Sequence, residues 1–187
     1  MNDRIRNVTE DLERVSAEAK QRLGELSAEQ LNWKPAPDRW SVAQCIDHLI
    51  EAHQRYFPLF RRLANGEVRM TLWERLSPFS GFFGRFLIKS LHPDNQKKMK
   101  TTPKAAPSNS DLGDRIITRF LEHQEELSEH LRALPDDLDA ENLIVTSPFL
   151  NFLTYSVDDT YTILVVHCQR HLGQAIRVTE TEGFPGP

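Results

Sequence analysis

Two histidines near the end of the chain, His167 and His171, have a spacing that suits metal binding. They lie in the sequence VVHCQRHLGQ, with three residues between them. Residues at positions i and i+4 of an α-helix lie on the same face, with Cβ atoms about 6 Å apart. Two imidazoles at this distance can chelate one ion, but the pattern also arises by chance in helices. It therefore indicates a metal site only if a third ligand lies nearby.

The pair requires a helix that begins well before His167. Ser156 is suited to cap this helix, and Asp158 and Asp159 suit its positively polarised start. We expect the helix to end near Thr179. Its apolar face would comprise Val157, Tyr161, Leu164, Cys168, Leu172 and Ala175. The two histidines lie beside this face, so a site there would border the core rather than occupy its centre.

Three further segments repeat apolar residues every three or four positions, as the buried faces of helices do. Helices are expected at about residues 3–26, 41–60 and 110–133. In the second, Ser41 and Gln44 can form a capping box, and Pro58 predicts a kink or break. Four amphipathic helices with a long crossover between the second and third predict an all-α protein, a four-helix bundle. We expect residues 1–187 to form a single domain.

The crossover between the second and third helices is expected to carry extra short helices. Its segment 72–91 is apolar and aromatic, and one or two short helices fit it best. We expect this segment to cover the bundle or to form a dimer contact. The alternative is a flexible lid or an element on a membrane surface, with Arg85 and Lys89 as its basic residues. Residues 92–110 are expected to be an extended surface crossover, and residues 134–155 a long loop with a turn of helix or strand.

The composition argues against several classes of function. The chain has 187 residues and a formal net charge of -4, which does not favour nonspecific binding to nucleic acid. No apolar run reaches the roughly 18 to 20 residues needed to span a bilayer, so no membrane insertion is expected. The first residues also lack the apolar core of a signal peptide. Cys45 and Cys168 form no CxxC motif and no disulfide framework, which favours a reducing cytoplasm.

The third ligand must come from the other five histidines, His48, His53, His92, His123 and His130. His53 lies at the middle of the apolar stripe of the second helix, where a core histidine satisfied by a hydrogen bond is expected. His48 lies to the side, beside small residues that leave room for an ion, but an exposed histidine fits the same position. Periodicity alone does not choose between them. His123 and His130 are about 10.5 Å apart along their helix, too far to share one ion, and His92 lies in a loop without an evident partner.

The motif WSVAQCIDHL in the second helix, followed by HCQRHLGQ in the last, resembles the DinB-like metalloprotein superfamily. In that family one histidine, eight residues after a tryptophan, joins two from a late His-x-x-x-His to bind a divalent metal ion. The matching tryptophan here is Trp40. The resemblance therefore implies the metal ligands His48, His167 and His171. It covers nearly the whole chain in helix order, although the middle segment looks longer than is typical.

This ligand set limits the metal and its chemistry. Three neutral imidazoles suit Zn²⁺ or Ni²⁺ better than Mg²⁺ or Ca²⁺, which prefer oxygen ligands. Three protein ligands leave coordination positions open, as in catalytic sites. Such an ion can lower the pKa of a bound water, polarise a substrate oxygen or stabilise a thiolate. The resemblance points to the thiolate, because relatives include thiol S-transferases and a thiol-dependent maleylpyruvate isomerase. We therefore expect a metal-dependent thiol S-transferase or hydrolase that acts on a small molecule, with a low-molecular-weight thiol as cosubstrate in the first case.

Several residues near the expected site have two explanations each. Gln44 and Gln174 are candidates to orient an imidazole from behind, although capping already explains Gln44. Cys45 lies one turn before His48 and could be a fourth ligand or redox partner, but a small buried helix residue explains it better. Glu51 could act as a base, but a solvated surface carboxylate is the preferred explanation, so the catalytic residues stay unknown. The alternative to an enzyme is a non-catalytic helical module with a structural or vestigial metal site. A homodimer is expected in either case.

Overall fold

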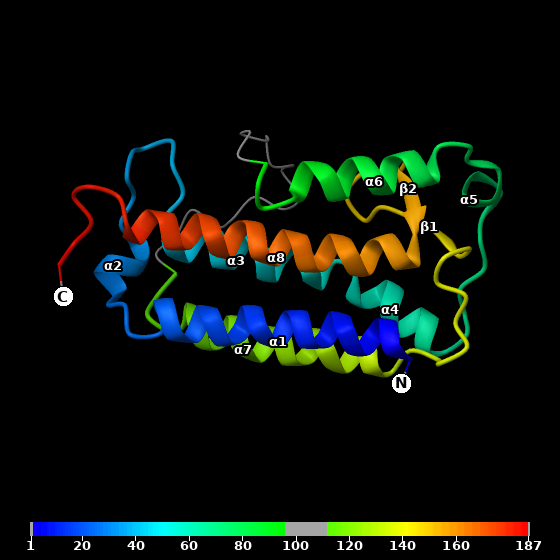
Figure 1. Ribbon diagram of the computed structural model, residues 1–187, viewed down its shortest axis with the longest axis horizontal. Coiled ribbons are helices and arrows are strands. Elements are labelled where there is room, and N and C mark those ends of the chain that lie inside the picture. Colours follow the sequence, from blue (N-terminus) through cyan, green and yellow to red (C-terminus); the bar gives the residue numbers. More distant parts are fainter. Residues whose placement is uncertain (1, 96–111, 187) are drawn as a thin grey trace.

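Four long helices form the body of the molecule in the computed structural model, which describes residues 2–95 and 112–186 (Figure 1). They are α1 (Asp3–Leu23), α3 (Val42–Gln54), α7 (Ile116–Arg132) and α8 (Val157–Thr179). α3 packs against α7 and α8, and α1 packs against the same two helices. The first two long helices of the chain therefore lie diagonally across the bundle. The all-α fold and the four-helix bundle expected from the sequence are confirmed.

Capping boxes fix the start of both helices that carry the expected ligands. Ser41 Oγ accepts a hydrogen bond from the Gln44 amide at 3.1 Å, and Gln44 Oε1 accepts one from the Ser41 amide. In the same way, Ser156 Oγ accepts a hydrogen bond from the Asp159 amide at 2.9 Å. These contacts satisfy amides that the first turn of a helix leaves without a partner. Both predicted caps are therefore confirmed.

The predicted break at Pro58 is also confirmed. α3 ends at Gln54, and α4 (Phe57–Ala64) begins with Pro58 in its first turn. Proline is tolerated there because the first turn has no intrahelical acceptor for its missing N–H. The break lets the chain turn away from α8 just beyond His53, the last histidine of α3.

Two predicted helix boundaries differ from those in the structure. The first helix ends at Leu23, with Gly24 as its C-cap, and not near residue 26 as expected. The apolar spacing continues past Gly24 because Leu26 still packs against the core. Ser27 then caps the short helix α2 (Ala28–Asn32). The third helix begins later than the expected start near residue 110, which itself lies outside the described residues. Residues 112–115 are not helical, because Gly113 has a φ of 67°, and α7 begins at Ile116 with Arg115 as its N-cap.

Two short helices, α5 (Leu72–Leu76) and α6 (Ser80–Leu91), account for the apolar segment of the crossover. α6 packs along α8, as the covering role predicts. A Cβ at Gly84 would collide with the Asp159 carboxylate, so glycine permits this close approach. Within the described residues, no helix is long and apolar enough to cross a membrane.

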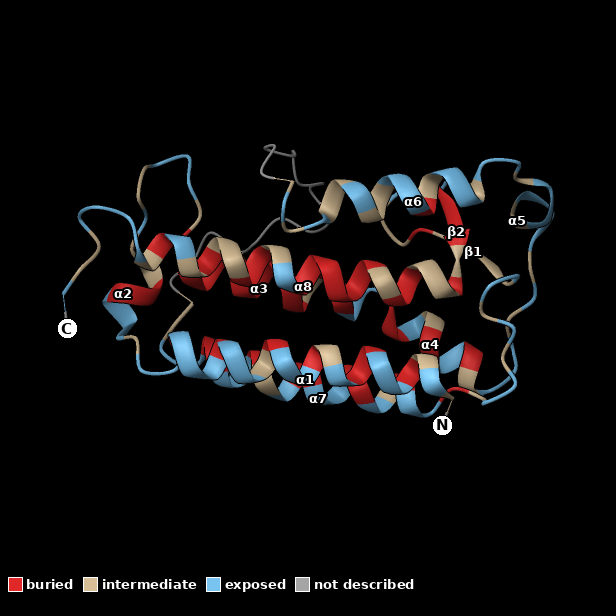
Figure 2. Ribbon diagram, in the orientation of Figure 1, coloured by how far each residue is buried: buried red, intermediate tan, exposed pale blue. Residues whose placement is uncertain are grey.

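The outer side of this cover is unusually apolar. Its large exposed side chains, together with two from the loop near residue 150, are Leu72, Trp73, Leu76, Phe79, Phe82, Phe86, Leu150 and Phe152. We call this set the apolar surface. Figure 2 shows α6 with much of its length exposed, in contrast to the buried turns of α8 beneath it.

The loop before α8 contains a short antiparallel hairpin, which the sequence had predicted as a turn of helix or strand. β1 (Ile144–Thr146) pairs with β2 (Thr154–Ser156), and Val145 lies opposite Tyr155. The hydroxyl of Tyr155 is 2.8 Å from that of Tyr56. The hairpin leads directly into the cap of α8 and connects the start of that helix to Tyr56, at the junction of α3 and α4.

Candidate metal centre

His48, His167 and His171 converge between α3 and α8, and we call them the histidine group. One ligand nitrogen from each ring lies within 4.8 Å of the other two. Nε2 of His48 is 3.0 Å from Nε2 of His167, and the rings of His48 and His171 meet edge to face with centroids 4.5 Å apart. The three residues are only 5 to 8% exposed. The structure thus brings together the three residues that the resemblance implied.

Helix geometry explains this convergence. His167 and His171 are one turn apart on α8, with ring centroids 4.7 Å apart. α3 packs along α8 over much of its length and brings His48 to face the gap between those two rings. The two capped helices therefore supply all three imidazoles, and no loop residue is needed to complete the group.

Trp40 closes one side of the histidine group. Its ring lies 5.0 Å from the ring of His48 and stacks on that of His171 at 5.7 Å, with 30° between the planes. Trp40 precedes the Ser41 cap, so the start of α3 also fixes its position. From the sequence, Trp40 is only the tryptophan that matches the family motif. The structure gives it a physical role, because an aromatic ring against two imidazoles limits their rotation and excludes water.

Of the two glutamines expected behind the imidazoles, Gln174 has the predicted contact. Its Oε1 is 3.0 Å from Nδ1 of His171. That bond places a hydrogen on Nδ1 and leaves the lone pair of Nε2 directed into the group. Gln44 completes the cap of α3 through its bond to Ser41, the role that already explained it.

His53 makes a contact with the histidine group that the sequence did not predict. It is a buried core histidine, as its place in the apolar stripe predicted. Its Nε2 lies 3.2 Å from Nδ1 of His167, on the other side of that ring from His48. The sequence shows two histidines on one buried helix, which indicates that either could contact the site. Which of them contacts His167, and from which side, depends on how α3 packs against α8.

Burial keeps the two α8 imidazoles of the histidine group neutral. Loss of solvation, with a smaller contribution from His48, lowers the pKa of His171 to about 3. Loss of solvation and the neighbouring histidines hold the pKa of His167 well below its usual range. Both imidazoles are therefore unprotonated at pH 7. Their lone pairs can bind a cation without first releasing a proton.

Neither cysteine belongs to the histidine group. Cys45 and Cys168 are free and fully buried. Burial raises the pKa of Cys45 above its usual value and that of Cys168 to about 12. Both are thiols at neutral pH and poor nucleophiles. The preferred explanation of Cys45, a small buried helix residue, agrees with its place in the core.

The remaining histidines and the candidate base lie apart from the group. His123 is buried beside Phe57, and His130 contacts the same ring from the surface side. His92 is near Asp94, with its Nδ1 3.4 Å from a carboxylate oxygen. Glu51 is half-buried. In the part of the chain that the structure describes, no carboxylate or thiol joins the three imidazoles as a potential ligand.

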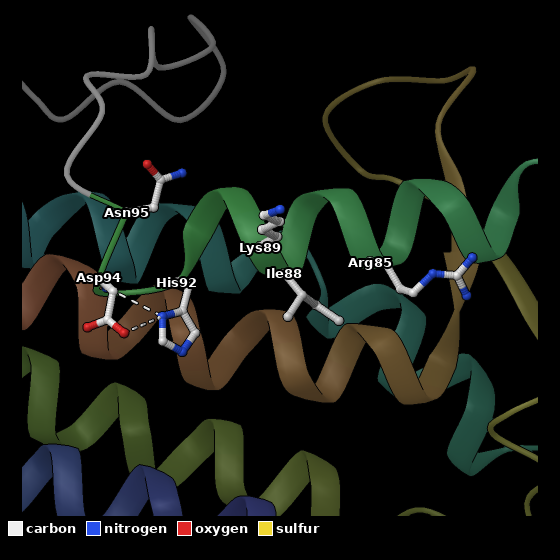
Figure 3. A pocket seen from close by; sticks show the side chains of 6 residues that line it. All are labelled: Arg85, Ile88, Lys89, His92, Asp94 and Asn95. Carbon is white, nitrogen blue, oxygen red and sulfur yellow. Dashed lines mark hydrogen bonds and ion pairs between the residues drawn. The ribbon is translucent and has the colours of Figure 1, made fainter.

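A surface pocket of about 640 Å³ lies at the C-terminal end of α6, not at the histidine group (Figure 3). Its walls include Arg85, Lys89 and His92. In Figure 3, Ile88 points from α6 toward α8, and Arg85 and Lys89 extend from the same helix. The pocket contains none of the expected ligands, so the buried imidazoles and not this hollow define the candidate site.

The donor set fits a divalent transition metal. Three nitrogen donors from neutral rings suit Zn²⁺ or Ni²⁺. Bonds from zinc to an imidazole nitrogen are about 2.0–2.1 Å long. Oxygen donors, which Mg²⁺ and Ca²⁺ require, are absent from the group among the described residues. His48, His167 and His171 are therefore the residues that could hold such an ion.

Comparison with known proteins places this arrangement in a family. A family model described as the DinB superfamily matches residues 11–175. The structure of YfiT from Bacillus subtilis, described as a probable metal-dependent hydrolase with an unusual four-helix bundle topology, has a similar fold. It superposes with a TM-score of 0.58 at 16% identity, over 97% of this chain and 89% of that chain. No curated protein sequence is significantly similar. Because the family match spans most of the sequence, including the histidine group, this chain belongs to the DinB superfamily.

Proposed function

We propose that His48, His167 and His171 bind one divalent metal ion, with Zn²⁺ or Ni²⁺ as the favoured metals. We further propose that the protein is a metal-dependent enzyme of the hydrolase type that acts on a small molecule. One observation carries the proposal: three imidazoles from two helices meet at one point, without a carboxylate or thiol among them in the described residues.

The chemistry of the donors supports a reactive centre. Three neutral nitrogens leave the full positive charge of a divalent ion uncompensated, and such an ion supplies Lewis acidity toward a substrate oxygen or an attacking water. Structural zinc sites are usually closed by four protein ligands, whereas catalytic sites keep a position open. A group of three protein ligands therefore favours a catalytic role over the non-catalytic alternative.

The surrounding residues would hold the donors in place. Gln174 accepts the Nδ1 hydrogen of His171 and so directs its Nε2 into the group. Trp40 packs against His48 and His171 and limits their rotation. Burial strengthens electrostatic interactions at the same point, because the local dielectric constant is low.

The hydrolase type is favoured over the thiol S-transferase. YfiT, the solved structure of similar fold, is described as a probable metal-dependent hydrolase, which supports this choice. In the transferase, a thiolate must attack the substrate. Cys45 and Cys168 are unsuited to this, because both are fully buried and burial raises their pKa. A transferase would therefore need a separate low-molecular-weight thiol.

Two further expectations accompany the proposal. A homodimer remains a prediction, which sedimentation equilibrium at several protein concentrations would test. A cytoplasmic location also remains a prediction. The two unpaired, buried cysteines agree with a reducing compartment.

Elemental analysis of the purified protein tests the metal site. We expect about one equivalent of zinc or nickel per chain, and its loss in His48→Ala. His92→Ala is the matched control, since His92 is half-exposed beyond the end of α6 and should not affect metal content. Absence of metal after reconstitution with either ion would refute the proposed function. Retention of metal in His48→Ala would refute the ligand set.

Hydrolysis and thiol transfer are then separated by activity. The loaded protein should hydrolyse small ester or amide substrates without added thiol. If turnover appears only with a low-molecular-weight thiol, and a thioether product forms, the transferase replaces the hydrolase. A loaded protein inactive in both assays would favour the non-catalytic module.

A further inference from the structure

His53, near the C-terminal end of α3, contacts His167 from behind. It is 1% exposed, and its Nε2 lies 3.2 Å from Nδ1 of His167. The other nitrogen of His167, Nε2, is the one that faces His48. His53 therefore contacts His167 on the side of the ring that points away from the other proposed ligands.

The hydrogen on His167 must be on the nitrogen that faces His53 if the ring is to bind a metal ion. A neutral imidazole has one hydrogen on its two ring nitrogens, and only the other nitrogen offers a lone pair. With Nε2 as the donor to the ion, Nδ1 bears the hydrogen and needs an acceptor, because a buried donor without one is costly. Nε2 of His53 lies at hydrogen-bond distance, and this role places the hydrogen of His53 on its own Nδ1.

The far side of His53 has a partner that suits this arrangement. Its Nδ1 is 3.9 Å from Sγ of Cys168, and Nε2 of Gln124 donates a hydrogen bond to the same sulfur at 3.1 Å. A thiol sulfur is a weak acceptor, but it has two lone pairs and can therefore accept a hydrogen bond from each N–H group. The contacts from His167 through His53 to Gln124 join α8, α3 and α7.

The second α8 ligand is supported in a parallel way. Nδ1 of His171 contacts Oε1 of Gln174 at 3.0 Å. Metal-binding histidines nearly always have such a partner behind the ring, which fixes the tautomer and orientation. With His53 behind His167, each of the two α8 rings has its own acceptor.

We infer that His53 is a positioning residue of the metal centre: it accepts the Nδ1 hydrogen of His167 and keeps the Nε2 lone pair directed at the point shared with His48 and His171. This inference rests on the proposed metal site. Without the acceptor, the hydrogen of His167 would move to Nε2, where it can be donated to His48. His167 would then present an N–H group instead of a lone pair.

The metal-free protein provides the first test. With ¹⁵N-labelled histidine, NMR should show the hydrogen bonded to Nδ1 of His167, with a scalar coupling across the N–H···N hydrogen bond to Nε2 of His53. This measurement needs no metal and no activity. Absence of the coupling, or a hydrogen bonded to Nε2 of His53 instead of Nδ1 of His167, would overturn the inference when both rings are resolved.

Metal affinity provides the second test, measured as competition for Zn²⁺ with a chelator. His53→Leu removes the acceptor at similar volume and should weaken binding by about 10- to 100-fold. His53→Gln places an amide oxygen near the same position and should recover most of the affinity. Wild-type affinity in His53→Leu would overturn the role of His53.

His123→Leu is the matched control for loss of a buried histidine. His123 is 4% exposed, its ring lies 6.0 Å from that of His53, and neither of its ring nitrogens has a hydrogen-bond partner among the described residues. This variant should bind Zn²⁺ about as tightly as the wild type. Equal weakening in both leucine variants would show a packing effect and overturn the inference. If the wild type binds no Zn²⁺ although the coupling is present, the proposed metal site fails while the contact stands.

Discussion

The histidine group buries polar side chains, whereas the apolar surface exposes apolar ones. In the first, three polar rings are at most 8% exposed, whereas the large apolar side chains of the second are 38 to 76% exposed. Burying a polar group is costly unless it has a hydrogen-bond partner. The rings of the histidine group contact each other, His53 and Gln174. The apolar side chains keep a large part of their surface in contact with water after folding.

The two regions therefore depend on different parts of the fold. The histidine group exists only because α3 and α8 hold distant residues together, so its chemistry and its acid sensitivity both follow from the fold. The apolar surface belongs to α5, α6 and the loop near residue 150, which cover the bundle from outside. We expect substitutions in the first region to change metal binding or acid stability, and substitutions in the second to change neither.

The largest effect is expected for His171→Ala. Loss of a proposed ligand should weaken Zn²⁺ binding by more than about 100-fold, the upper end of what loss of an outer partner costs. The bundle should still fold, because the core of α8 lies on the adjacent face. Chelator competition measures the first effect and circular dichroism the second. A variant that unfolds outright would show that His171 is a core residue.

A smaller effect is expected from acid on the metal-free protein. The pKa of His171 falls from 6.5 in an exposed site to about 3 in the fold. Between these values the unfolded chain binds a proton that the folded one does not, so stability is full above pH 6.5 and falls as the pH drops toward 3. Urea unfolding at several pH values measures this. His171→Phe should flatten the dependence, and an unchanged slope would contradict the role of burial at this ring.

Gln174→Leu should have a weaker effect on the metal than His171→Ala. It removes the acceptor behind His171 but leaves all three ligands in place, so we expect Zn²⁺ affinity to fall by about tenfold. Gln174→Glu should keep or raise the affinity, because a carboxylate is a stronger acceptor. Equal affinity in the wild type and both variants would show that the contact does not orient the ring.

The smallest effect is expected at the apolar surface. Phe82→Ser and Phe86→Ser should change the free energy of unfolding by no more than about 0.5 kcal/mol, as is usual at exposed positions. Zn²⁺ affinity should not change. Phe83→Ser is the contrasting variant within the same helix. Phe83 packs against the core, so this substitution should destabilise the protein. A loss of Zn²⁺ affinity in Phe82→Ser would mean that the two regions are coupled.

Local sequence signals predicted most of the fold because they act over a few residues. The caps at Ser41 and Ser156 and the break at Pro58 depend on hydrogen bonds within one turn of helix. The spacing of Leu26 predicts a first helix that continues to residue 26, but the helix ends at Leu23 with Gly24 as its C-cap. Periodicity detects which residues are buried, but not always which ones share a helix.

The choice between His48 and His53 shows where periodicity fails. Every residue from Val42 to Ile50 is buried, so α3 has no exposed face there that could sort its histidines into inner and outer ones. The family motif assigned His48, and the rotation of α3 against α8 then determined that His53 meets His167 from behind. That rotation depends on the packing of the whole bundle and has no local sequence signal.

The separation of the proposed ligands along the chain affects how the protein unfolds. His48 and His167 are 119 residues apart, whereas His167 and His171 are neighbours on one helix. In the unfolded chain the neighbouring pair can still chelate an ion, but recruiting His48 requires closing a long loop, at an entropic cost that grows with loop length. An ion at the proposed site would therefore act as a cross-link between two distant parts of the chain, much as a disulfide does. α3 and α8 would separate only after the ion is released, so the loaded protein should unfold slowly.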